Sequence, residues 1–184
     1  MSASVSKSED EVAALRGLDD AARSSGAIVS EGVLAGVIAA SAVAAVFFVV
    51  DLIAGHPLRT PQQLGAMLLS LFGASSQGDV ATPLALYTLF HFVAFMIAGI
   101  LAAAIVQVTM KQPVAILLFV ILFFAFEVAF TGFVAFLDVT STGGVTPVQV
   151  AIGNVVASIA MALFFRARHP RLRSIGRTLA AAEE

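Results

Sequence analysis

The sequence has no cysteine, no tryptophan, one tyrosine and only three histidines among its 184 residues. The lack of cysteine excludes disulfide bonds, thiolate catalysis, iron–sulfur ligation and cysteine-based zinc sites. Charged residues make up 12% of the chain, about half the share found in ordinary globular proteins, and the formal net charge is −2. Because the chain is not basic and carries no recognition motif, the sequence gives no support for nucleic-acid binding.

What the chain has in abundance is long hydrophobic runs, and hydrophobic residues make up 59% of it. A membrane-spanning helix needs about 20 mostly apolar residues. The sequence therefore predicts an all-α fold, a polytopic four-helix bundle in a lipid bilayer, with its transmembrane domain over residues 28–165. The predicted spans are residues 32–54, 83–108, 113–137 and 147–165.

Basic residues flank these runs unevenly, and basic flanks resist translocation across the membrane. If the chain crosses four times, Lys111 and the five arginines of the tail fall on one side with Arg23, whereas Arg59 falls on the other. We therefore expect both termini to be cytoplasmic. In this topology the Arg-rich tail, residues 166–184, is the anchor that sets the orientation.

The acidic leader, residues 1–27, is expected on the cytoplasmic side with a short amphipathic helix. Its start signal is the capping box Ser8-Glu9-Asp10-Glu11, and the helix is expected to end near Ala22. Such a helix either lies on the membrane or on a partner protein, or it is a partly frayed leader, since a short isolated helix is barely stable in water.

A second short helix is predicted over residues 61–72. Thr60 has the role of N-cap, Pro61 the first helical position, and Gln63 lies three residues after the cap. This helix is too short to span, so we expect it to lie in the outer interface in preference to dipping into the bilayer. The signal recurs at Thr146-Pro147-Val148-Gln149, where the last span begins.

Each predicted span carries one polar residue at a similar depth. Ionisable side chains within a membrane cost several kcal/mol and are candidates for function. Counting residues inward from the outer ends of the helices places four residues in one layer, with other polar residues nearby on the same helix faces. The layer comprises Ser41, His91, Glu127 and Asn154, and the supporting residues are Tyr87, Thr88, Thr131 and Ser158.

Two uses of this layer remain open. It is either a structural clasp that fixes helix register, which the sequence favours, or a site for a proton, a cation or another ligand. A carboxylate and one histidine are too few ligands for a metal site, and a haem in a four-helix protein usually needs two histidines. We therefore expect no metal and no cofactor.

Further polar residues gather in the segments expected outside the membrane. They either bind a polar ligand or simply make the turn after the first span and anchor the chain at the interface. These outer-loop residues are Asp51, His56, Arg59, Asp79 and Asp138.

Small residues recur at every fourth position on the first two predicted spans, which permits close approach of another helix. The stripes either pack the two spans against each other or form an interface with a partner. They comprise Gly32, Gly36, Ala40 and Ala44 on the first span and Ala94, Ala98 and Ala102 on the second.

No nucleotide-binding glycine loop and no nucleophile–base motif is present. The sequence therefore favours a membrane protein without catalysis of its own, acting as an accessory or assembly subunit of a larger complex or as a homo-oligomer. The alternative is a small transporter, channel or ligand-binding protein that uses His91 and Glu127.

The segment from Asp51 to Gly65 reads DLIAGHPLRTPQQLG. It resembles a set of uncharacterised bacterial four-helix membrane proteins that share the pattern DLxAGxPLxTPxxLG. The resemblance extends to Tyr87–Phe92 and to Arg168-His169-Pro170, and excludes the first 25 residues. It implies a bacterial inner-membrane protein with four spans and draws attention to Asp51, Pro57, Thr60, Pro61 and His91, but it implies no activity.

Overall fold

The structure is a computed structural model that describes residues 2–74, 78–136 and 146–170. All regular structure in these residues is helical, which confirms the all-α class. The elements are α1 (Ser2–Ile53), α2 (Arg59–Leu71), α3 (Ala81–Lys111), the 3-10 turn η1 (Pro113–Ile116), α4 (Leu117–Phe136) and α5 (Pro147–Arg168).

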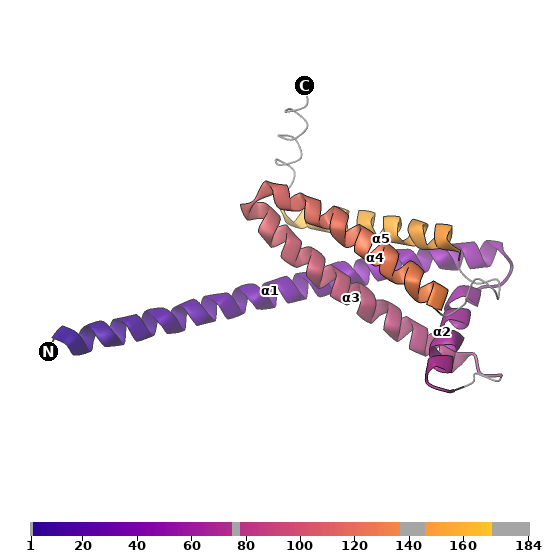
Figure 1. Cartoon of the computed structure of the whole chain (residues 1–184), viewed down its shortest axis with the longest axis horizontal. Coiled ribbons are helices and arrows are strands. Elements are labelled where there is room, and N and C mark those ends of the chain that lie inside the picture. Colours follow the sequence, from indigo (N-terminus) through magenta and orange to yellow (C-terminus); the bar gives the residue numbers. More distant parts are fainter. Residues whose placement is uncertain (1, 75–77, 137–145, 171–184) are drawn as a thin grey trace, which may run out of the picture.

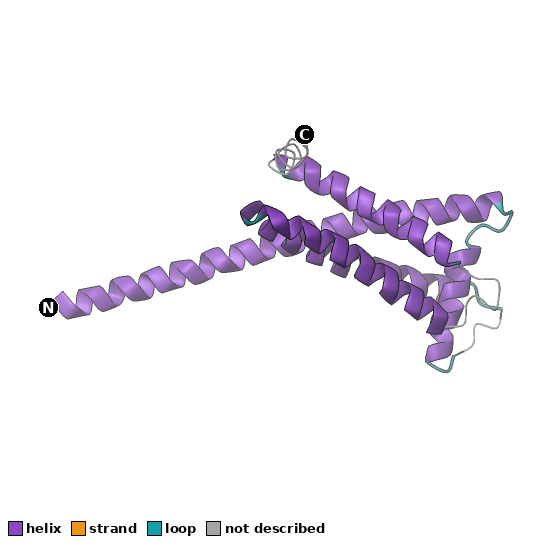
Figure 2. Ribbon diagram, turned by 45° about the horizontal axis from the view of Figure 1, so that its top comes forward, coloured by secondary structure: helices purple, strands orange, loops and turns teal. Residues whose placement is uncertain are grey.

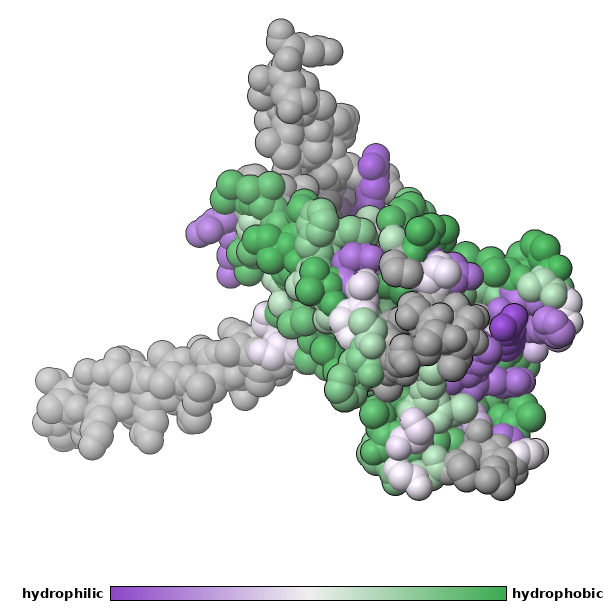
Figure 3. Space-filling model, turned by 45° about the vertical axis from the view of Figure 1, so that its right-hand side comes forward, coloured by the Kyte–Doolittle hydropathy of each residue, from purple (hydrophilic) through white to green (hydrophobic). Residues whose placement is uncertain are grey.

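Three of the described helical segments are long and apolar enough to cross a membrane: Ser24–Ile53, Ala81–Lys111 and Val148–Arg168. The apolar part of α4, Leu117–Phe133, is shorter. Large hydrophobic side chains are exposed on α1, α3, α4 and α5, and Figure 3 shows hydrophobic residues over much of the visible surface of the bundle. Water would oppose such a surface whereas lipid solvates it, so the fold is that of a membrane protein.

The helices pack in an alternating arrangement (Figures 1 and 2). α3 runs back alongside α1, α4 returns, and α5 again runs in the direction of α3. α1 packs extensively on both α3 and α5, whereas α3 has few contacts with α4 or α5. α2 lies across the end of the bundle where α3 begins, and it packs on α3. α3 and α4 therefore leave space between them.

The contact between α1 and α3 is made by backbone. A Cβ added to Gly36 would lie 2.3 Å from the Phe95 carbonyl oxygen, and one added to Gly99 would lie 2.1 Å from the carbonyl oxygen of Gly32. Only glycine permits helices to approach this closely. α1 and α3 thus form the tightest helix pair of the bundle.

Helix boundaries differ from the sequence prediction at several places, among them α1 and α2. The leader helix was expected to end near Ala22, but α1 continues without a break to Ile53 and extends beyond the bundle (Figure 1). The residues between Ala22 and the first span are compatible with a helix, and only Gly26 has a low helix propensity. Nothing in this segment therefore terminates the helix.

The expected start of the second short helix was also wrong. α2 begins at Arg59, with Leu58 as N-cap in the left-handed region at φ 67°. Thr60 lies inside the first turn because its amide and hydroxyl are bound by Asp51, as described below. At α5, by contrast, Thr146 and Gln149 form the predicted capping box, and Pro147 occupies the first turn.

Candidate functional site

The polar residues predicted to share one layer separate into two groups. The imidazole of His91 is 7% exposed and lies between α3 and α1. Its Nε2 is 3.0 Å from the carbonyl oxygen of Ala40, and because that oxygen can only accept, Nε2 carries the donated proton. Nδ1 lies 3.5 Å from the hydroxyl of Tyr87. His91 thereby joins α3 to α1.

The second group joins α4 to α5. The side-chain amide of Asn154 donates a hydrogen bond to Oε2 of Glu127, and both residues are half-buried. This hydrogen bond gives each side chain a partner at a position where lipid would offer none. Counting depth along the helices places these two residues at the same height, and the structure brings them together.

Ser41 of the predicted layer, and the supporting residues Thr88, Thr131 and Ser158, stand apart from these two groups. Ser41 is exposed, and its hydroxyl donates to the carbonyl of Val37. Thr88 donates in the same way to Leu84. Thr131 is half-buried, and Ser158 is exposed at the edge of a cavity described next. A serine or threonine hydroxyl that bonds to the preceding turn needs no partner from another helix.

A cavity of about 570 Å³ lies between α3, α4 and α5. Val43 and Phe47 of α1 and Thr60 and Leu64 of α2 also line it. Protein interiors normally contain few voids larger than a water molecule, so this volume is not a packing defect of ordinary size. Alanine, valine and phenylalanine side chains make up most of its lining. Phe90, Val120 and Ser158 line it and are also exposed at the surface, so the cavity is open to the outside of the bundle.

Polar groups reach the cavity at both ends. His91, Tyr87 and Asn154 line it toward the end near α2, and Thr109 and Arg166 line it toward the ends of α3 and α5. The sequence did indicate the first three, but it gave no signal for Thr109, which stands among hydrophobic residues. Arg166 was interpreted only as part of the basic tail.

Thr109 is the exceptional polar residue of this cavity. It is fully buried, and its hydroxyl has no hydrogen-bond partner among the described residues. An unsatisfied buried hydroxyl costs about 1–3 kcal/mol. Most threonines in helices avoid this cost by bonding to the preceding turn, as Thr88 does. Thr109 is therefore the buried residue of the cavity lining whose hydroxyl lacks a partner among the described residues.

The outer-loop residues have mainly local roles. Asp51 is 5% exposed and binds Thr60, and Asp79 Oδ1 accepts the backbone amides of Ala81 and Thr82 at the start of α3. His56 and Arg59 are exposed. Asp138 lies outside the described residues. The two described carboxylates are thus engaged by the starts of α2 and α3.

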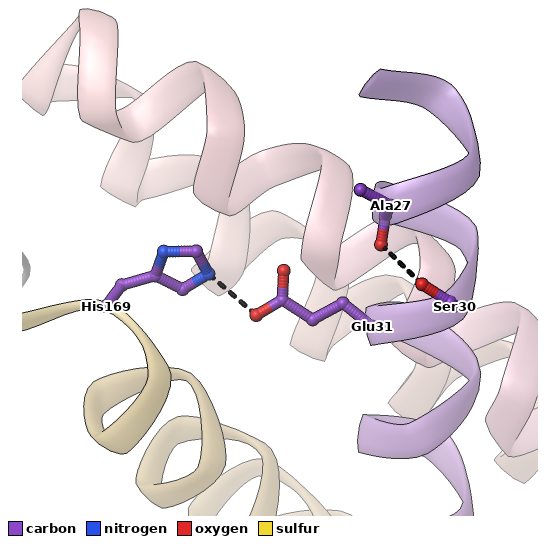
Figure 4. A network of polar contacts seen from close by, with 4 residues as sticks. All are labelled: Ala27, Ser30, Glu31 and His169. Atoms are coloured by element: carbon purple, nitrogen blue, oxygen red, sulfur yellow. Dashed lines mark hydrogen bonds and ion pairs between the residues drawn. The ribbon is translucent and has the colours of Figure 1, made fainter. Parts of the chain in front are cut away.

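At the opposite end of the bundle, His169 contacts α1 across a wide separation in the sequence. Its Nε2 lies 2.7 Å from Oε1 of Glu31, and both side chains are mostly buried (Figure 4). Ser30, beside Glu31, donates to the carbonyl of Ala27 on the same helix. The contact places the end of α5 next to the first turns of the apolar part of α1.

The predicted stripes of small residues are largely used inside the molecule. Gly32, Gly36 and Ala40 are buried, the two glycines directly against α3, and Ala44 is exposed. Ala98 and Ala102 are buried, and Ala94 is half-buried and lines the cavity. The glycine positions are thus covered by the chain itself.

No group of three His, Asp or Glu side chains close enough to hold a metal ion occurs within the described ranges. Comparisons of the chain with protein-family models, with curated protein sequences and with solved structures give no match. The function must therefore be argued from the cavity and its lining.

Proposed function

We propose that this chain is a four-span bacterial inner-membrane protein that binds a hydrophobic small molecule in the cavity between α3, α4 and α5. The observation that carries the proposal is the cavity itself. Its volume of about 570 Å³ lies within the range of about 300–1,000 Å³ typical of ligand pockets, which are mostly apolar with a few convergent polar groups. Of the two functions that the sequence leaves open, this favours ligand binding over the accessory-subunit role.

The direction of the helices supports α4 as a fourth span. α3 ends at Lys111, and the contact of His169 with Glu31 places the end of α5 beside the start of the apolar part of α1. α5 must therefore begin at the far end, and α4 is the element that returns there (Figure 1). Its 20 residues extend about 30 Å, about the thickness of the hydrocarbon core.

Charge supports the orientation. Lys111, Arg166 and Arg168 lie where α3 and α5 end, whereas Arg59 begins α2 at the other end. By the positive-inside rule, the end with three basic residues faces the cytoplasm, as do both termini. α2 then lies at the outer interface.

The hydrogen bonds support a passive role for the polar residues in the middle of the membrane. His91 binds a carbonyl of α1 and Asn154 binds Glu127, so each contributes to packing. His91 fixes α3 to α1, and Asn154 joins α5 to α4. The site therefore works by binding, without a catalytic step.

The test is to purify the full chain in a mild detergent and to identify bound small molecules by native mass spectrometry and by extraction. Ala94→Phe places a large side chain in the cavity. Ala104→Phe is the matched control on the same helix, at an exposed position outside the cavity lining. We expect the wild type and Ala104→Phe to retain a molecule that Ala94→Phe loses, with all three proteins monodisperse. Equal retention by all three would refute the proposal.

An accessory-subunit role is the second candidate, and the extension of α1 beyond the bundle favours it. An isolated helix is marginal in water, and a partner surface would stabilise it. Co-purification of stoichiometric partner chains that are lost when residues 1–22 are deleted would support this role. A partner-free protein would exclude it.

A further inference from the structure

The cavity extends along most of α3. On α3 its lining extends from Tyr87 to Thr109, a distance of about 33 Å along the helix. Over this length most of the lining side chains are alanine, valine and phenylalanine, which suit the hydrocarbon part of a ligand. The length and the apolar lining together suit a long alkyl chain.

The two ends of the cavity differ in what they offer to a ligand. Near α2, His91 and Asn154 already have protein partners. At the other end, the buried hydroxyl of Thr109 has none, and Arg166 alone is charged among the described residues that line the cavity. An arginine together with a free hydroxyl donor suits carboxylate or phosphate oxygens, because guanidinium binds both through charge-assisted hydrogen bonds.

We propose that the cavity binds one long alkyl chain with an anionic head, and that the head lies between Thr109 and Arg166. This assignment rests on the proposed function and names its ligand class. A fatty acid and an anionic phospholipid both supply this chemistry. The chain would occupy the apolar length toward Tyr87, and the head would remain at the membrane surface where α3 and α5 end.

The test measures binding of radiolabelled palmitate and of its uncharged analogue hexadecanol to the full chain in detergent. We expect the wild type to bind palmitate at least tenfold more tightly than hexadecanol. Arg166→Gln should weaken palmitate binding at least tenfold and leave hexadecanol binding unchanged. Arg168 is exposed as Arg166 is but does not line the cavity, so Arg168→Gln is the matched control and should behave as the wild type.

Thr109→Val provides an independent test. Removing an unpartnered buried hydroxyl should raise the melting temperature of the ligand-free protein and at the same time weaken palmitate binding several-fold. A purely structural threonine would change only the melting temperature. The assignment of the head would be overturned if Thr109→Val changed only the melting temperature. It would also be overturned if the wild type bound palmitate and hexadecanol equally, or if Arg166→Gln and Arg168→Gln had equal effects on palmitate binding.

Ala94→Phe separates this failure from failure of the proposed function. If Ala94→Phe abolishes binding of palmitate and of hexadecanol while Arg166→Gln leaves both unchanged, only the head assignment is wrong. If Ala94→Phe changes the binding of neither probe, the cavity is not the binding site. Competition in nanodiscs distinguishes a phospholipid ligand from a fatty acid. Displacement of bound palmitate by phosphatidylglycerol and not by phosphatidylcholine supports a phospholipid ligand. Palmitate binding that neither lipid changes supports a fatty acid.

Discussion

Both carboxylate oxygens of Asp51 accept a hydrogen bond from Thr60, Oδ2 from the backbone amide and Oδ1 from the hydroxyl, each at 2.8 Å. The pair joins the last turn of α1 to the first turn of α2. The chain between them turns sharply, with Gly55 at φ 77° and Leu58 at φ 67° in the left-handed region. Asp51, Gly55 and Thr60 of this chain therefore share one structural role, the turn between α1 and α2.

Asp51→Ala should lower the free energy of unfolding by about 1–3 kcal/mol, because it leaves the amide and hydroxyl of Thr60 without their partner. Asp51→Asn retains one acceptor oxygen and should lose less. Unfolding in sodium dodecyl sulfate, followed by circular dichroism, measures the difference. Equal stability of Asp51→Ala and the wild type would show that water replaces the carboxylate at no cost.

Gly36→Ala should prevent stable packing of α1 on α3. Its new Cβ would lie 2.3 Å from the carbonyl oxygen of Phe95, and a helix backbone cannot yield locally by the distance required. Gly132→Ala is the matched control, since nothing lies within 4 Å of its added Cβ. It should be neutral or stabilise α4 by about 0.5–1 kcal/mol. Size-exclusion chromatography and thermal melting distinguish the two, and a monodisperse Gly36→Ala protein of normal melting temperature would contradict the observed contact.

Glu127→Gln should preserve the fold, because the glutamine carbonyl still accepts the hydrogen bond from Asn154. Glu127→Leu leaves the amide of Asn154 unpaired and should destabilise the protein by about 1–3 kcal/mol. Both variants are compared by melting temperature in the same detergent. If Glu127→Gln fails to fold while Asn154→Leu folds normally, the negative charge itself is required.

Asp79 should make the stability of α3 dependent on acid pH. Hydrogen bonds from the Thr82 side chain and from the amides of Ala81 and Thr82 hold the pKa of Asp79 below its usual value of 3.8. A carboxyl with a lowered pKa stabilises the fold fully above its unfolded value and loses that effect as the pH falls through the folded value. Asp79→Asn should therefore melt below the wild type at pH 7, with the gap closing below pH 3.8. A gap independent of pH would exclude the charge as its cause.

Features of the fold that depend on spacing along the chain could be predicted from the sequence. Hydrophobic length located the apolar helices, and the capping signal at Thr146 placed the start of α5. Depth counting brought Glu127 and Asn154 to the same height, and their side chains meet. The depth of a residue does not give the direction in which its side chain faces around the helix, however. His91 contacts α1 because glycines allow α3 to pack directly against α1.

The cavity could not be predicted for a related reason. It depends on how far α3 diverges from α4, which is a property of helix angles and not of any segment. Thr109 and Arg166 acquire their importance only from lining this space together. Likewise, Thr60 looks like a helix cap in the sequence, and only the fold reveals that Asp51 takes both of its donors.

The openness of the cavity on its membrane-facing side, where Phe90 and Val120 are exposed, determines how its occupancy would be set. A ligand would enter sideways from the bilayer, so its mole fraction among the lipids matters and its concentration in water does not. Lipid tails are as apolar as the cavity lining, so an alkyl chain gains little by exchanging one for the other. Selection among amphiphiles would then depend almost entirely on the few polar atoms of the cavity lining.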